Sequence, residues 1–417
     1  MKKDFISEQI AALIFKLFII VALFFPVMTS YVENQELNGA YPEKILVNFV
    51  AVLFLLIYTI SRCIRQQYRV NNVVLVFLLV LVLIAYVDSY MNNMPQIQWI
   101  WQARNTVVSF LMFIILVATD DKDFFERFNI QRFMIRSIII TNFIAIIVYF
   151  KGYIAMHMYD GKLRFILQNP DFYEKRFNWI YSYKCQYAMM LILFVAFCVA
   201  NKDKFINKRT YLISLFVLAI CLIICHTNTA IIGSILIIFT KILDAIIQEK
   251  KNRKKLALVI IPVVAVGFVI FKRIMLERDL SSLGSRKWIW KATIQKIIDN
   301  PKGLGMNFTY DRIQVNETWS VTNGHNIFLN EVLRLSIVVG TCFIVFFVLI
   351  LLFALIKKFS FFTLGIIVAF LMQACMDYSI LPSELTMCMC MFYFIFFLPY
   401  QTGEYQKDSK EIMNEKS

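Results

Sequence analysis

Long apolar segments recur along the whole chain and are separated by polar stretches. A helix that crosses the hydrocarbon core of a bilayer needs about 20 mostly apolar residues, and interfacial residues extend shorter segments. On this basis the pattern predicts about twelve spans, at residues 9–29, 44–60, 73–91, 99–119, 136–150, 184–200, 211–225, 230–247, 256–271, 333–356, 361–376 and 384–399. No polar stretch of domain length interrupts them, so we expect a single membrane domain over residues 1–417.

Composition agrees with this pattern. Hydrophobic residues make up 59% of the chain and charged residues 17%, whereas soluble domains have about 45–50% and about 25%. Eight of the nine cysteines lie within or beside apolar segments, so no disulfide framework is visible. The expected fold class is an all-α polytopic membrane protein.

The net charge of +15 raises the question of a nucleic-acid partner. With the amino terminus inside, alternate connections and both tails hold 23 of the 43 Lys and Arg residues. The short connections on the other side, residues 30–43, 92–98, 226–229 and 377–383, hold none. Cytoplasmic loops carry this excess of positive charge for reasons of insertion. We therefore expect a multi-pass protein with both termini in the cytoplasm and no nucleic-acid partner.

Two long outer connections are cationic nonetheless. Residues 151–183 carry five Lys and Arg, and residues 272–332 carry nine. Long loops cross the membrane largely regardless of charge, so the topology stands. Two interpretations remain open: a solvated surface with its own acidic partners, or an anionic ligand at the outer face of the membrane.

The second of these outer loops contains an amphipathic pattern. Over residues 286–300, helical spacing places Trp290, Ile294, Ile297 and Ile298 on one face, which predicts a helix at the membrane interface. Asn300-Pro301 ends it, because the residue before proline avoids the α region. Gly303 and Gly305 then predict a tight turn with positive φ.

Three residues of the outer loops are candidates for chemistry. His325 has the side chain of a general base, although a lone histidine is more often structural. Arg164 and Arg286 have guanidinium groups that fit phosphate oxygens, and either one also fits an ordinary surface position. Carboxylates that can orient His325 lie at three outer span ends, at Glu331, Asp377 and Glu384. No cluster has metal-ligand spacing and no glycine loop fits a nucleotide, so we expect neither a metal nor a cofactor.

The order of these residues resembles a known signature. Arg286 precedes the helix, Asn300-Pro301 and Gly303-Leu304-Gly305 follow it, and His325-Asn326 with Leu329 comes before a span. This order resembles that of the bacterial O-antigen polymerase and O-antigen ligase superfamily. Arg164-Phe165 with Asn169-Pro170 is similar to the family's other arginine segment, although Asp171 stands where Asn is common. Ser336 also departs from the family, which often has Gly there.

The resemblance implies an inverting, metal-independent glycosyltransferase of the membrane class C type, in the bacterial plasma membrane. Its family polymerises undecaprenyl-diphosphate-linked oligosaccharide units into capsular or O-antigen polysaccharide. By position, Arg164 and Arg286 bind the diphosphate and His325 activates the acceptor hydroxyl. Asn326, Gly303, Gly305 and Glu331 are expected to support them. The implied partners are the lipid-linked oligosaccharide, membrane lipid and other proteins of polysaccharide assembly.

Three alternatives stay open. A ligase of the same fold differs only in its acceptor. A flippase or other transporter of lipid-linked sugars predicts internal repeats and charges near the membrane midplane; the sequence contains no evident repeat, and Lys16 is the one charge placed near mid-span. A non-catalytic scaffold for polysaccharide assembly is the third.

Overall fold

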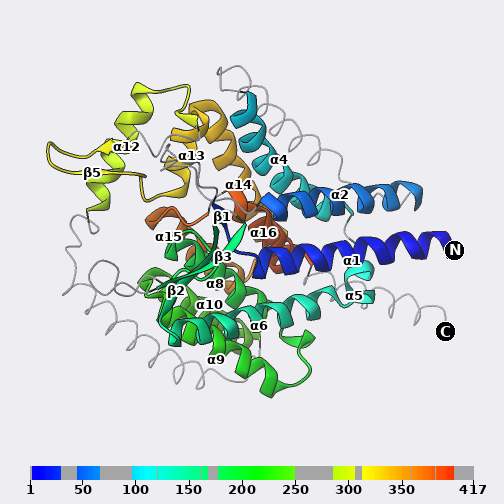
Figure 1. The fold of residues 1–417 in the computed structure, drawn as a ribbon. Helices are drawn as coiled ribbons and strands as arrows, with labels where there is room; N and C mark the ends of the chain where they lie inside the picture. Colours follow the sequence, from blue (N-terminus) through cyan, green and yellow to red (C-terminus); the bar gives the residue numbers. More distant parts are fainter. Residues whose placement is uncertain are drawn as a thin grey trace.

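The computed structural model describes residues 2–29, 45–65, 96–119, 121–159, 161–167, 177–248, 285–305, 312–357, 359–380 and 382–398. These residues are mostly helical (Figure 1). Ten of the predicted spans fall among them, and each contains a helix. The predicted spans at 73–91 and 256–271 lie outside the described residues.

Ten helices form the bundle of the described residues. They are α1 (Lys2–Phe24), α2 (Ile45–Arg65), α4 (Gln96–Thr119), α6 (Ile130–Phe150), α8 (Lys184–Ala200), α9 (Lys208–Cys225), α10 (Asn228–Gln248), α14 (Ile337–Lys357), α15 (Phe361–Met376) and α16 (Pro382–Phe392). Shorter pieces are α5 (Lys122–Arg127), η1 (Lys202–Lys204), α12 (Arg286–Asp299), α13 (Ile327–Leu335) and the π-helical turn η3 (Tyr393–Phe397).

Five segments of the described chain are long and apolar enough to cross a membrane: 7–24, 130–150, 208–225, 228–247 and 337–356. Five further helices are apolar but shorter. Helix α8 lies at the centre, because every residue from Gln186 to Val199 is buried. A helix that is apolar on all sides belongs inside a bundle or a membrane. The prediction of a mostly helical, membrane-embedded protein is therefore supported by helix length and by burial.

One end of the bundle, which we call the Arg62 end, is joined by ionic contacts. Arg62 of α2 contacts Glu8 of α1 at 3.4 Å and also Asp121, which precedes α5. Arg127 lies 2.9 Å from Glu8 as well. These contacts bring the start of α1, the end of α2 and the residues around α5 to one end of the bundle, as the positive charge of these segments predicts.

The opposite end, which we call the Asp377 end, is where α6 and α15 finish and α8 begins. The Cys185 Sγ–H near the start of α8 donates to the carbonyl of Tyr378, 3.2 Å away, just after α15. Cys225 Sγ at the end of α9 lies 3.3 Å from the carbonyl oxygen of Lys184. Figure 1 shows this end of the bundle turned away from the N-terminus.

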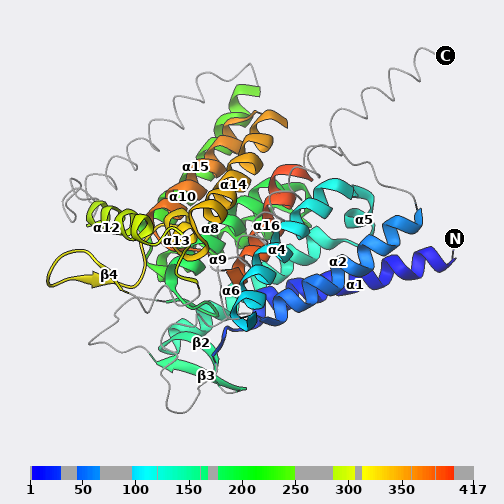
Figure 2. The ribbon, with the colours of Figure 1, turned by 90° about the horizontal axis from the view of Figure 1, so that it is seen from above.

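Two small sheets form in segments that connect the helices. Strands β1 (Met28–Thr29), β2 (Tyr153–Tyr159) and β3 (Lys162–Leu167) form one sheet in that order, with β1 parallel to β2 and β3 antiparallel to it. Strands β4 (Ile313–Gln314) and β5 (Ser320–Val321) form an antiparallel pair. The apolar pattern did not indicate these strands, and Figure 2 shows the β2–β3 hairpin projecting beyond the helices.

The predicted span 333–356 is wrong at its start, because the helix breaks at Ser336. Helix α13 ends at Leu335, and α14 begins at Ile337. Ser336 has φ 130° and ψ 167°, a region that is strained for residues other than glycine. The predicted turn after α12 packs against this break: Leu304 N donates to the carbonyl of Leu333 at 2.8 Å, and Ile337 N donates to that of Pro301 at 3.0 Å. The backbone of the turn therefore forms hydrogen bonds with the Leu333 carbonyl and the Ile337 N–H, which the break leaves without a partner in the helix.

Gly303 is the turn residue with the least space. Its φ is +79°, and a Cβ there would lie 2.7 Å from Ser336 N and 2.8 Å from the carbonyl oxygen of Arg334. Gly305 also has a positive φ, 71°, which confirms the predicted turn. Gly152 has a similar φ of +85° but nothing within 4 Å of its Cβ position. Adding a Cβ at Gly152 therefore costs only backbone strain, whereas adding one at Gly303 costs backbone strain and a steric clash.

We predict that Gly303→Ala lowers the free energy of unfolding more than Gly152→Ala does. The left-handed conformation costs each alanine about 1–2 kcal/mol, and only Gly303→Ala adds a backbone clash of about 1–3 kcal/mol. Denaturant titration of both purified variants in detergent measures the difference. Equal losses would show that the turn after α12 does not pack tightly on the α13–α14 break.

Candidate functional site

Three side chains from distant parts of the chain meet at the Asp377 end. Asp377 Oδ1 lies 3.3 Å from Arg286 Nη2 and 3.3 Å from His325 Nδ1. Arg286, the first residue of α12, also donates from Nε to the carbonyl of Met376 at 2.5 Å. Two of the three predicted site residues therefore share one carboxylate. We call Arg286, His325 and Asp377 the Asp377 cluster.

The segment before α13 fixes the position of His325. Its backbone is left-handed, with φ 46°, and its N–H donates to Asn323 Oδ1 at 3.0 Å. Asn326 is the N-cap of α13: Oδ1 accepts from Leu329 N at 3.1 Å, and Nδ2 donates to the carbonyl of Cys375 at 3.3 Å. Asn326 thus joins the start of α13 to the end of α15, two residues from Asp377.

Gly324 packs the segment that carries His325 closely against α12. Its N–H donates to Asn330 Oδ1 at 2.8 Å, and a Cβ on Gly324 would lie 2.7 Å from Thr293 Oγ1. Thr293 is fully buried in the middle of α12. The loop that carries His325 is therefore held between α12, α13 and α15, which is the rigid support that a positioned side chain needs.

Within the Asp377 cluster, His325 is the most accessible member. Its side chain is 38% exposed, against 18% for Asp377 and 17% for Arg286. Nδ1 faces the carboxylate, and Nε2 has no hydrogen-bond partner among the residues that the structure describes. A carboxylate on Nδ1 holds the imidazole in one orientation and fixes its tautomer. Nε2 is then the nitrogen placed to accept a proton.

Glu331 was predicted to support the site, but it does not contact His325 in the described structure. It is 2% exposed, accepts a hydrogen bond from Tyr378 Oη at 2.9 Å and pairs with Arg334, whose Nε lies 3.2 Å away. Tyr378 is the residue after Asp377, so Glu331 supports the cluster through the backbone. Asp377, one of the three carboxylates considered from sequence, is the one that contacts His325.

We predict that Glu331→Ala destabilises the protein by about 3–5 kcal/mol, because it leaves the Arg334 guanidinium buried without its carboxylate. Thermal unfolding in detergent measures this loss. Glu317→Ala, at an exposed position of the same loop, is the matched control and should change little. The double variant Glu331→Leu/Arg334→Met should recover most of the lost stability; no recovery would contradict the ion-pair explanation.

Arg164 lies on another element and does not contact the Asp377 carboxylate. It is exposed in β3, opposite His157 in the β2–β3 register. His157 is buried, and its Nε2 lies 3.0 Å from the carbonyl oxygen of Tyr181. Since Tyr181 leads directly into α8, the sheet and the Asp377 cluster share one end of the bundle. Asn169 and Pro170 of the predicted arginine segment lie outside the described residues.

Helix α12 forms where it was predicted, but its buried face differs. Ile289, Thr293 and Ile297 are buried, whereas Ile294 is 47% and Ile298 60% exposed. Only Ile297 of the predicted apolar face is buried, because the loop before α13 covers the stripe centred on Thr293. The outward face combines Ile294 and Ile298 with two exposed lysines and Trp288, and such a face suits a membrane interface.

The Asp377 cluster unites a fixed cation, a carboxylate and an accessible imidazole. This arrangement is able to bind an anionic group and to remove a proton beside it. Among the described residues, no group of three or more His, Cys, Asp or Glu is placed to hold a metal ion. No protein-family model matches the chain, and no curated protein matches it.

Proposed function

We propose that this protein is a membrane glycosyltransferase that polymerises oligosaccharide repeat units carried on undecaprenyl diphosphate into a capsular or O-antigen polysaccharide. The observation that carries the proposal is the Asp377 cluster, in which Asp377 lies 3.3 Å from both Arg286 and His325. The order of Arg286, the glycine turn and His325 along the chain supports the same activity.

The proposed reaction assigns one task to each side chain. His325 Nε2 takes the proton of the acceptor hydroxyl, whose oxygen attacks the anomeric carbon. The bond from that carbon to the diphosphate breaks, and the electron pair leaves with the lipid diphosphate. Attack opposite the leaving group inverts the anomeric centre. Arg286 stabilises the negative charge that grows on the diphosphate, and the same role for Arg164 remains a prediction.

The location fits a lipid-borne donor. The exposed face of α12 carries Trp288, Ile294 and Ile298, which are 53%, 47% and 60% exposed, close in sequence to Arg286. Apolar side chains mixed with lysines place a helix at headgroup level, where the diphosphate of a lipid carrier lies. Arg286 begins this helix, so a lipid at the interface delivers its diphosphate to the cluster without leaving the membrane.

We predict that Asp377→Asn lowers the rate of polymerisation about 10–100-fold, by analogy with the loss when a carboxylate that orients a metal-binding histidine is removed. The amide keeps the shape of the side chain but not the negative charge that contacts both His325 and Arg286. Asp299→Asn, at an exposed position of α12, is the control. Rates of chain extension by the two purified variants provide the test, and a wild-type rate for Asp377→Asn would remove Asp377 from the mechanism.

The activity is tested by giving proteoliposomes of the purified protein a single substrate, a repeat unit linked to undecaprenyl diphosphate. A polymerase converts it into a ladder of chain lengths. Transfer only after a different acceptor is added would identify a ligase, and movement of unchanged oligosaccharide across the bilayer would identify a transporter. Either result would overturn the proposed polymerisation.

A further inference from the structure

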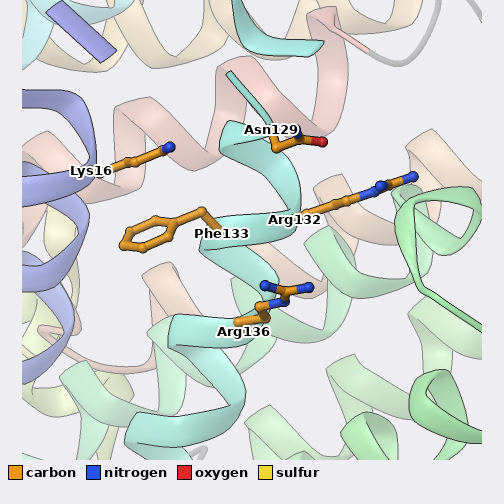
Figure 3. A pocket seen from close by; sticks show the side chains of 5 residues that line it. All are labelled: Lys16, Asn129, Arg132, Phe133 and Arg136. Atoms are coloured by element: carbon orange, nitrogen blue, oxygen red, sulfur yellow. The ribbon is translucent and has the colours of Figure 1, made fainter. Parts of the chain in front are cut away.

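A cationic cavity lies between α1 and α6, near the Arg62 end and away from the Asp377 cluster. It has a volume of about 260 Å³, is open to the surface, and is lined by Lys16, Phe133 and the exposed residues Asn129, Arg132 and Arg136. Figure 3 shows Lys16 reaching from α1 toward the first turns of α6, which carry the other lining residues. Nothing in the proposed transfer reaction uses these side chains.

The cations of this cavity differ from their neighbours in having no acidic partner within the part of the chain that the structure describes. Arg62 pairs with Glu8 and Asp121, and Arg127 with Glu8. Among the described residues, Lys16, Arg132 and Arg136 form no ion pair with a carboxylate. Lys16 Nζ lies 5.7 Å from the centre of the Phe133 ring. Three positive charges therefore border one cavity, and no carboxylate of the described residues pairs with them.

The start of α6 adds to this positive potential. Asn129 precedes the helix in a left-handed conformation, with φ 53°, and its side chain does not cap the helix. The first turn contains no acidic residue. A helix N-terminus carries a partial positive charge and favours an anion. Together with the three cations, it favours binding of an anion such as a phosphate in this cavity.

The surface beside the cavity identifies the kind of phosphate. On α6, residues that follow Arg132 and Arg136 at helical spacing are exposed and apolar: Ile140 is 53%, Phe143 54% and Ile147 43% exposed. On α1, Leu13 and Leu17, which flank Lys16, are 68% and 45% exposed. In a membrane-spanning helix such side chains face lipid. A cationic pocket that continues into an apolar stripe matches a phosphate joined to acyl chains.

We propose that this cavity binds the phosphate of an anionic phospholipid, with Arg132, Arg136 and Lys16 around the headgroup and an acyl chain along Ile140, Phe143 and Ile147. The site is separate from the Asp377 cluster and does not depend on the proposed enzyme activity. Arginine holds phosphate oxygens by charge-assisted hydrogen bonds, and the apolar stripe excludes soluble phosphates as the natural occupant.

The experiment titrates the purified full-length protein, in uncharged detergent, with dioleoyl phosphatidylglycerol. Native mass spectrometry counts the bound lipid, and the shift in Tm follows its affinity. For the wild type we expect one tightly held phosphatidylglycerol, and at least about tenfold weaker binding to Arg132→Gln/Arg136→Gln, since the charge-assisted hydrogen bonds from both arginines to the phosphate are lost. The matched control, Lys208→Gln/Arg209→Gln, removes two exposed cations from the start of α9 and should bind like the wild type.

Three results would overturn the proposal. Equal losses in the two double variants would mean that general surface charge attracts the lipid. Equal binding of dioleoyl phosphatidylcholine would exclude selection of an anionic headgroup, and equal binding of glycerol 1-phosphate would identify a soluble ligand. The Tm without lipid verifies folding, and Lys16→Met provides the same comparison if the arginine variant does not fold.

Discussion

His325→Ala is expected to lower the rate of polymerisation about 10²–10⁴-fold, the contribution of a positioned general base. His325 Nδ1 lies 3.3 Å from Asp377 Oδ1, and the loop before α13 fixes the backbone of this residue. Alanine removes the only imidazole that contacts Asp377 among the described residues, so the acceptor hydroxyl keeps its proton. Binding of the donor lipid should change little, because Arg286 remains in place.

The matched control for His325→Ala is His226→Asn. His226 is exposed at the same end of the bundle, in a left-handed conformation with φ 52° that asparagine tolerates. Chain extension is measured for both purified variants at equal protein concentration, with Tm as the test of folding. Polymer of normal length and rate from His325→Ala would favour a scaffold or a transporter over an enzyme.

Arg286→Gln is the second substitution with a large expected effect, a fall of about 10²–10³-fold in kcat. The guanidinium is 17% exposed and is held by Asp377 and by the carbonyl of Met376. A fixed, partly buried cation stabilises charge on a leaving diphosphate better than a solvated one does. Because this charge grows as the bond breaks, kcat should fall more than KM rises.

Two further variants, Arg286→Lys and Arg312→Gln, test whether that loss comes from the geometry of the Arg286 guanidinium or from the total charge of the loop. Lysine keeps the positive charge but loses the planar fork of donors, so an intermediate rate is expected. Arg312 is an exposed cation between α12 and α13, and its substitution should leave the rate unchanged. An equal fall for Arg312→Gln would mean that the loop acts through its total charge and not through the Asp377 cluster.

Much of the helical fold was predictable because two strong constraints act on the sequence of a membrane protein. Apolar length marks the spans: the segments later found as α1, α6 and α10 are each apolar over at least 18 residues. Lys and Arg mark the connections, and the contacts of Arg62 and Arg127 with Glu8 join segments that the charge pattern places together. Both signals are local in the chain, so a single sequence contains them.

The features that were missed depend on contacts between distant residues. Ser336 breaks the predicted span because the turn from Pro301 to Gly305 packs against it, and no apolar count reveals such a neighbour. The buried stripe of α12 follows Thr293, a polar residue that packs on Gly324. Strand β2 has no alternation of apolar and polar residues, and one of its buried residues is the polar His157, so its sequence does not show the pattern of a strand.

The candidate site was predictable in part. Arg286 and His325 were found from their order in one loop, and the structure brings both to one carboxylate. Asp377 lies outside that loop, at the end of α15, and was one of three acidic residues at span ends that sequence alone could not rank. Its only local signal is its place directly after an apolar helix. The contact that identifies Asp377 is the one with His325, which lies 52 residues earlier in the chain.

The most direct test of the central claim is the stoichiometry of the reaction catalysed by the purified protein. With one lipid-diphosphate-linked repeat unit as substrate, released lipid diphosphate and new glycosidic bonds are counted together, for the wild type and for His325→Ala. We predict one lipid diphosphate per new bond in the wild type, and both products lowered in parallel in the variant. Bond formation without release of lipid diphosphate, or equal rates in the two proteins, would contradict glycosyl transfer at the Asp377 cluster.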